Sequence, residues 1–120
     1  MTEFYIFESD PLVRADIIDI VGELDPRLAI NVADTTDFLA NRLYVSSNSS
    51  VVILSGQSDQ LDTFFSQTDP SPLHSFVVIG DGDRSFLPED YFISPVFRPF
   101  SDKSLSEGIK NALSFLRSDH

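Results

Sequence analysis

Short apolar runs alternate along the chain with stretches of helical periodicity. Four of these runs are rich in β-branched and aromatic residues and end in polar turns: 4–7, 28–32, 51–54 and 76–79. Continuous apolar runs of this length are typical of strands buried on both faces of a parallel sheet. A fifth short strand is predicted over Pro95–Phe100, and a proline ends it.

Four segments show the spacing of an amphipathic helix. The first begins at Pro11 and ends before Pro26, residues 34–35 cap the second, and residues 101–102 cap the last. The apolar positions of the last three helices are Phe38, Leu39, Leu43 and Tyr44; then Leu61, Phe64 and Phe65; then Leu105, Ile109, Ala112, Leu113 and Leu116.

Strands that alternate with helices predict an α/β fold. We expect a flavodoxin-like (βα)5 open parallel sheet in the order 2-1-3-4-5, forming a single domain over residues 1–120. The polar run Ser46–Ser50 is too short for an interdomain linker. The segment Arg84–Ser94 contains Pro88 and no sustained apolar stripe, which predicts a shortened or irregular fourth helix.

The amino-acid composition argues against several classes of function. The chain has 120 residues, 19 acidic and 8 basic, with a net charge of −11 and no cysteine. The charge disfavours nucleic-acid binding, and the absence of cysteine excludes disulfides and thiolate zinc sites. No apolar run reaches the ~20 residues of a membrane span, so we expect a cytoplasmic domain without membrane contact.

The charge is unevenly distributed along the sequence. The residues before Arg98 include four basic and sixteen acidic side chains, whereas those from Arg98 onward include four basic and three acidic ones. Cations near the end of a last helix account for part of this difference. A separate surface with its own partner is the alternative.

Polar residues stand where the predicted strands end. Because the carboxyl ends of parallel strands share one edge of the sheet, these residues should form a polar pocket. They are Glu8, Ser9 and Asp10 after the first strand, Ser55 after the third, Gly80 and Asp81 after the fourth, and Arg98 after the fifth.

Four motifs resemble those of response-regulator receiver (CheY-like) domains and occur in the same order along the chain. They are Phe7–Arg14, Val51–Gly56, Val77–Gly80 and Arg98–Ser101, and together they span nearly the whole chain. In that family the first strand ends in an acidic pair, the third in a phosphorylated aspartate, the fourth in threonine or serine, and the fifth precedes Lys-Pro-Phe.

The departures from the family pattern indicate a degenerate receiver, or pseudo-receiver. Glu8 keeps the first acid, but Ser9 replaces the Mg²⁺-binding acid and Ser55 replaces the phosphoacceptor aspartate. Gly80 stands at the threonine position and Arg98 at the lysine position. Since an acyl phosphate needs a carboxylate, we expect no phosphorylation at Ser55, no bound metal or cofactor, and no enzymatic activity.

The expected role is phosphorylation-independent binding to a protein partner in two-component signal transduction or a phosphorelay, with a homodimer as a further expectation. One alternative is a working receiver that uses Asp10 or Asp81 as an unusual acid. A third reading is a small Mg²⁺-dependent phosphotransferase, because Asp81-Gly82-Asp83 follows a strand and resembles the DxD signature of haloacid-dehalogenase-type enzymes.

The resemblance also implies an interaction surface. The family's usual signalling face corresponds to residues 86–100 and the last helix, where this chain loses its acidic excess. Large apolar side chains and both lysines gather in this part of the sequence. The residues predicted for this interface are Phe86, Tyr91, Phe97, Phe100, Lys103, Lys110 and Phe115.

Overall fold

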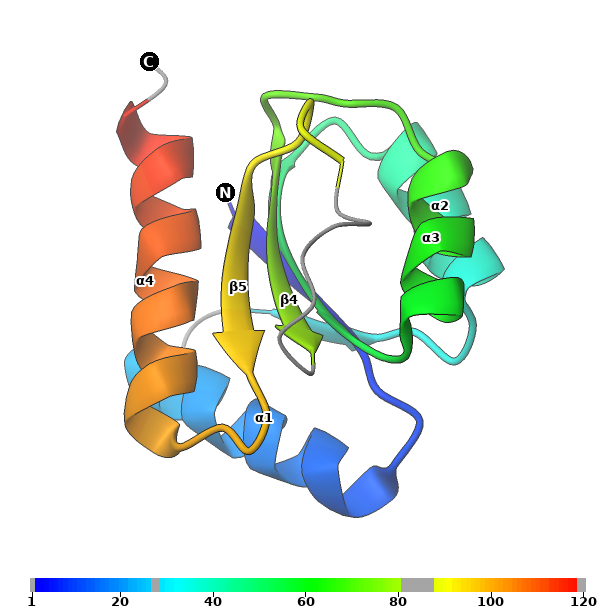
Figure 1. Ribbon diagram of the computed structural model, residues 1–120. Coiled ribbons are helices and arrows are strands. Elements are labelled where there is room, and N and C mark those ends of the chain that lie inside the picture. The colour runs from blue at the N-terminus through cyan, green and yellow to red at the C-terminus, as the bar shows by residue number, and fades with distance from the viewer. Residues whose placement is uncertain (1, 27–28, 81–87, 119–120) are drawn as a thin grey trace.

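The computed structural model describes residues 2–26, 29–80 and 88–118. Within these ranges, five strands and four helices follow one another (Figure 1). Their bounds are β1 Thr2–Phe7, α1 Pro11–Leu24, β2 Ile30–Val32, α2 Thr36–Val45, β3 Ser49–Ser55, α3 Ser58–Ser66, β4 His74–Gly80, β5 Ile93–Phe97 and α4 Asp102–Ser118.

The strands form one parallel sheet in the order β2-β1-β3-β4-β5. Helices α1 and α4 cover one face, and α2 and α3 cover the other (Figure 1). The flavodoxin-like fold and its strand order, expected from the sequence, are therefore confirmed. None of the helices in the described ranges is long and apolar enough to cross a membrane.

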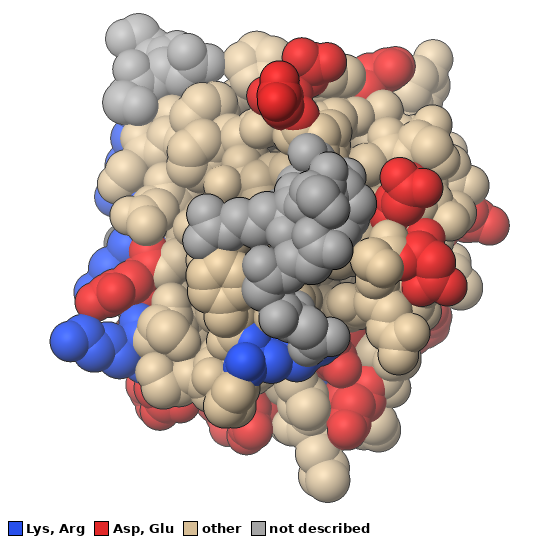
Figure 2. All heavy atoms as spheres, in the orientation of Figure 1, with Lys and Arg blue, Asp and Glu red and all other residues tan. Residues whose placement is uncertain are grey.

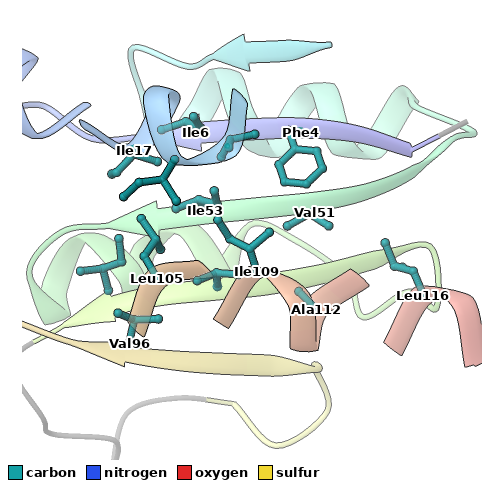
Figure 3. Close-up of a cluster of buried hydrophobic side chains, with 14 residues drawn as sticks. Phe4, Ile6, Ile17, Val51, Ile53, Val96, Leu105, Ile109, Ala112 and Leu116 are labelled. Atoms are coloured by element: carbon teal, nitrogen blue, oxygen red, sulfur yellow. The ribbon is translucent and has the colours of Figure 1, made fainter. Parts of the chain in front are cut away.

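Two hydrophobic clusters, one on each face, hold the helices to the sheet. In β1, Phe4 and Ile6 belong to the α1–α4 side, while Tyr5 and Phe7 belong to the α2–α3 side. This alternation continues through β3 and β4, as the period of two along a strand requires. Figure 3 shows the α1–α4 cluster, in which Leu105 and Ile109 of α4 meet the aliphatic side chains of the central strands.

Strand β5 begins earlier than the sequence indicated and also ends earlier. It was predicted over Pro95–Phe100, but the ladder with β4 runs from Ile93 to Phe97. Pro95 lies inside the strand, which is tolerated because β5 is the edge of the sheet and only one side needs donors. Pro99, which has no N–H, follows soon after the strand ends.

Polar residues extend the inner strands beyond their apolar runs. Ser49 and Ser50 belong to β3 and not to the predicted 46–50 loop, and His74 and Ser75 open β4. The buried Ser75 hydroxyl donates to the Ala112 carbonyl of α4 at 3.0 Å, which satisfies it.

The connection between β4 and β5 was expected to hold a shortened or irregular fourth helix. Residues 88–92, its described part, contain turns and bends but no helix. The remainder, 81–87, lies outside the described residues, as do Asp81 and Phe86 of the predictions.

Candidate functional site

Three of the predicted pocket residues meet at the carboxyl edge of the sheet. Glu8 directly follows β1, Ser55 ends β3 and Arg98 follows β5. The Arg98 Nη2 donates to Ser55 Oγ at 2.6 Å and lies 4.0 Å from Glu8 Oε2. The parallel register brings these side chains from distant parts of the sequence to one place.

The two contacts of Arg98 differ in kind. The 2.6 Å distance to Ser55 is a short hydrogen bond from a charged donor. The 4.0 Å separation from Glu8 is at the outer limit of an ion pair, and Glu8 Oε2 has no hydrogen-bond partner among the described residues. Of these two contacts, the serine hydrogen bond holds the guanidinium more closely, and the carboxylate adds longer-range attraction.

Glu8 is buried, and the start of α1 holds it. The Asp10 backbone N–H donates to Glu8 Oε1 at 3.2 Å, and Arg14 Nη1 donates to the Glu8 carbonyl at 3.4 Å. Arg14 belongs to the family-like motif Phe7–Arg14, but the sequence predicted no contact between it and Glu8. Its place in the first turn of a helix that follows the acidic strand end is the signal that could have revealed this contact.

Asp10 caps a helix. It is the N-cap of α1, and its Oδ1 accepts the backbone N–H of Leu12 at 2.9 Å. An aspartate in this position satisfies a backbone donor that the helix itself leaves free. Ser9, beside it, is exposed. Within the described ranges, no cluster of three acidic or histidine side chains is arranged to hold a metal ion.

Gly80 contributes backbone to the site. Its carbonyl accepts the Arg98 backbone N–H at 2.8 Å, which extends the pairing of β4 with β5 past the last strand residue. A Cβ built on Gly80 would meet none of the described heavy atoms within 4 Å. The position could therefore accommodate a threonine or serine, and its lack of a hydroxyl is not imposed by these neighbours.

The residues predicted for an interface occupy different environments. Phe97 is 42% exposed, and Lys103 and Lys110 are exposed on α4. Phe100 is half-buried against the α1–α4 cluster, and so is Phe115, whose ring stacks on Phe92 with centroids 4.3 Å apart.

Tyr91, also predicted for the interface, is partly internal. Its hydroxyl donates to the Thr68 carbonyl at 2.6 Å, and its ring packs on Phe65 and Phe76 of the α2–α3 cluster. These contacts hold the β4–β5 connection against α3. Tyr91 therefore has a structural role, because it packs beneath the predicted interface.

Solved receiver domains share this fold over nearly the whole chain. The signal receiver domain of an HD domain-containing protein from Pseudomonas fluorescens matches with a TM-score of 0.70 at 15% identity, with 98% of each chain covered. A CheY-like response regulator receiver domain from Methanospirillum hungatei matches with a TM-score of 0.70 at 18% identity, again with 98% of each chain covered.

A third similar structure is the BeF3-activated conformation of SdrG from Pseudomonas melonis. It matches with a TM-score of 0.53 at 18% identity, covering 95% of this chain and 94% of that one. No protein-family model matches the sequence, and no curated protein matches it significantly. At identities this low the likeness establishes the receiver fold, and function has to be argued from the site.

Proposed function

We propose that this chain is a cytoplasmic receiver-like domain of two-component signalling that binds a protein partner without being phosphorylated and without acting as an enzyme. One observation carries the proposal: the Arg98 guanidinium donates to a serine hydroxyl where a phosphoacceptor carboxylate would be needed. A serine could give a phosphoester only with a base to activate it, and among the described residues Glu8 Oε2 makes no hydrogen bond to the Ser55 hydroxyl.

The contacts and charges of the strand-end site also support a role without phosphorylation. Arg98 brings a fixed positive charge close to Glu8, so part of the charge that a bound cation would supply is already present. Asp10, the nearest other acid in sequence, has one carboxylate oxygen engaged in capping α1. Because its charged groups already have these contacts, the site supports a role that needs no phosphoryl transfer.

Phosphorylation can be tested directly. The protein is incubated with Mg²⁺ and acetyl phosphate and then measured by intact mass spectrometry. We expect no increase of about 80 Da, the mass of one phosphoryl group, because the acyl-forming carboxylate is absent. A hydroxylamine-labile adduct that maps to Asp10 or Asp81 would instead show a receiver with an unusual acid. Turnover of p-nitrophenyl phosphate would show a phosphotransferase.

Restoring the missing acids tests the metal site. We expect Ser55→Asp alone to bind no Mg²⁺, because the new carboxylate would pair with Arg98 in place of the present hydrogen bond. Ser9→Asp combined with Ser55→Asp should bind Mg²⁺ measurably by calorimetry, since two ligands act on one ion and their effects are not additive. Tight binding by the unchanged protein would contradict this account of the pocket.

A further inference from the structure

A second cavity lies at the opposite end of the sheet from Glu8, Ser55 and Arg98. Its volume is about 250 Å³, and it is enclosed by the C-terminal half of α2 and by the loop that joins α3 to β4. In Figure 1 that loop passes over the ends of the strands away from the arrowheads. We call this cavity the α2–β4 groove; its lining residues used below are Tyr44, Ser46, Gln67, Asp69, Leu73 and His74.

The rim of the groove exposes large apolar side chains. Tyr44 of α2 is 84% exposed and Leu73 is 39% exposed, although both lie beside the cavity. The side chain of His74 is buried, and its Nε2 has no hydrogen-bond partner among the described residues. Burial lowers the pKa of His74, so the imidazole is neutral and adds no positive charge to the groove.

Three acidic side chains line the groove or contact residues that line it. Asp69 lines it directly. Gln67 donates to Asp37 Oδ1 at 2.7 Å and Ser46 donates to Glu3 Oε1 at 3.2 Å, so two further carboxylates contact lining residues. In Figure 2 acidic side chains lie around most of the outline of this view, including the part over α2 and α3, while most basic ones lie along α4.

The one basic residue of α2 is turned away from the groove. Arg42 follows Ala40, a lining residue, by two positions, which places it about 200° further around the helix. The carboxylates at the groove are therefore not offset by the basic residue of α2, which favours a cationic ligand there.

We propose that the α2–β4 groove binds a basic peptide segment of a protein partner, which places one apolar side chain in the cavity and its lysine or arginine residues against Asp69 and its acidic neighbours. The cavity is smaller than the ~300–1,000 Å³ of a typical drug-sized ligand site, so it suits a side chain better than a whole small molecule. The exposed Tyr44 ring is available to pack on the incoming residue.

The probe is acetyl-Lys-Arg-Phe-Leu-Lys-Arg-amide, titrated into the ¹⁵N-labelled protein and followed by amide chemical shifts. We expect the shifts to cluster at Tyr44, Gln67 and Leu73. A peptide with Ala-Ala in place of Phe-Leu, and one with serine in place of every basic residue, should each bind at least about tenfold more weakly, because each lacks one of the two interactions.

Two pairs of variants separate the groove from the overall negative charge. Tyr44→Ser and Asp69→Asn should each weaken binding of the probe at least about threefold. Phe38→Ser, on another face of α2, and Asp62→Asn, on α3, remove similar exposed groups outside the groove and should leave binding unchanged. All four positions are exposed, so the variants should fold, and their amide spectra check this.

Three results would overturn the proposal: equal binding of the Ala-Ala peptide, shifts centred on β5 and α4, or unchanged affinity in both groove variants. Failure to bind any of the peptides would also overturn it. The proposed phosphorylation-independent role would stand in each of these cases, because that role rests on the opposite end of the sheet.

Discussion

Serine at position 55 changes what the neighbouring cation does. An aspartate there would form a charged pair with residue 98, and either ion could be drawn to other ligands. The neutral hydroxyl instead accepts a 2.6 Å hydrogen bond from Arg98 and has no charge of its own to offset that of the guanidinium.

His74 provides a prediction at the residue scale. Burial lowers its pKa below the ordinary 6.5, so the folded protein binds fewer protons than the unfolded chain in this range. The stability that depends on neutral His74 is complete above pH 6.5 and is lost as pH falls through 6.5 toward the folded pKa. We expect the free energy of unfolding to fall over this window.

Urea denaturation between about pH 7.5 and 5.5 measures this slope, because most carboxylates stay ionised there. The slope should be reduced in His74→Asn and retained in His120→Asn, which removes the other histidine of the chain. Equal slopes in all three proteins would show that burial of His74 carries no pH dependence.

The site could be predicted from the sequence only in part. The strand-end rule correctly brought Glu8, Ser55 and Arg98 together, because it depends on parallel topology alone. It could not assign Asp10, because an aspartate after a strand serves equally as a ligand or as a helix cap, and only the Leu12 N–H contact decides between them.

Helix α4 shows how closely an element can approach the sheet. Gly108 faces β5, and a Cβ added to it would lie 2.7 Å from Val96 Cγ2. The absence of a side chain lets the helix and the strand pack at this distance. Gly22 of α1 is the matched case, since a Cβ there would meet nothing described within 4 Å.

We therefore predict opposite effects for the same substitution in the two helices. Gly108→Ala should lower the free energy of unfolding by about 1–2 kcal/mol, because overpacking costs more than the gain in helix propensity. Gly22→Ala should raise it by about 0.5 kcal/mol, because only the propensity changes. Urea denaturation of both variants tests this, and a stabilised Gly108→Ala protein would show that α4 can move away from Val96.

At the element scale, the apolar pattern predicted the existence and the order of the helices and strands well, but it predicted their boundaries poorly. Continuous apolar runs made the inner strands visible, but β3 and β4 continue into serine and histidine residues that no hydrophobic pattern marks. Those residues are in the strands because the ladder pairs Ser50 with His74 and Val51 with Ser75. Pairing is a property of two segments, and a single segment does not reveal it.

At the scale of the whole molecule, basic side chains are concentrated on α4 and not on a whole face of the sheet, because α1 on the same face carries Asp16, Asp19 and Glu23. The α2–α3 side includes the acid-flanked groove, whereas α4 carries Lys103, Lys110 and Arg117. The exposed Phe97 lies at the end of β5, close in sequence to the start of α4. The groove and the lysine-bearing part of α4 therefore differ in local charge, and the strand-end pocket lies at the carboxyl edge of the sheet.

The predicted interface on β5 and α4 is best tested through its exposed members. Phe115 was an attractive choice from the sequence, but it stacks on Phe92, so replacing it would also cost folding energy. Phe97→Ser and the double variant Lys103→Glu/Lys110→Glu change exposed side chains only. Arg42→Glu on α2 reverses a charge outside this surface and is the matched control.

We expect the Phe97 and double-lysine variants to lose partners that the unchanged protein captures from its native host, as identified by mass spectrometry. Any self-association seen by light scattering should fall in the same two variants, because charge reversal removes attraction and serine removes apolar contact area. The Arg42→Glu protein should retain both. If capture persisted in the two β5–α4 variants and was lost on changing Glu8 to glutamine, the partner would instead recognise the strand-end pocket, where Glu8, Ser55 and Arg98 meet.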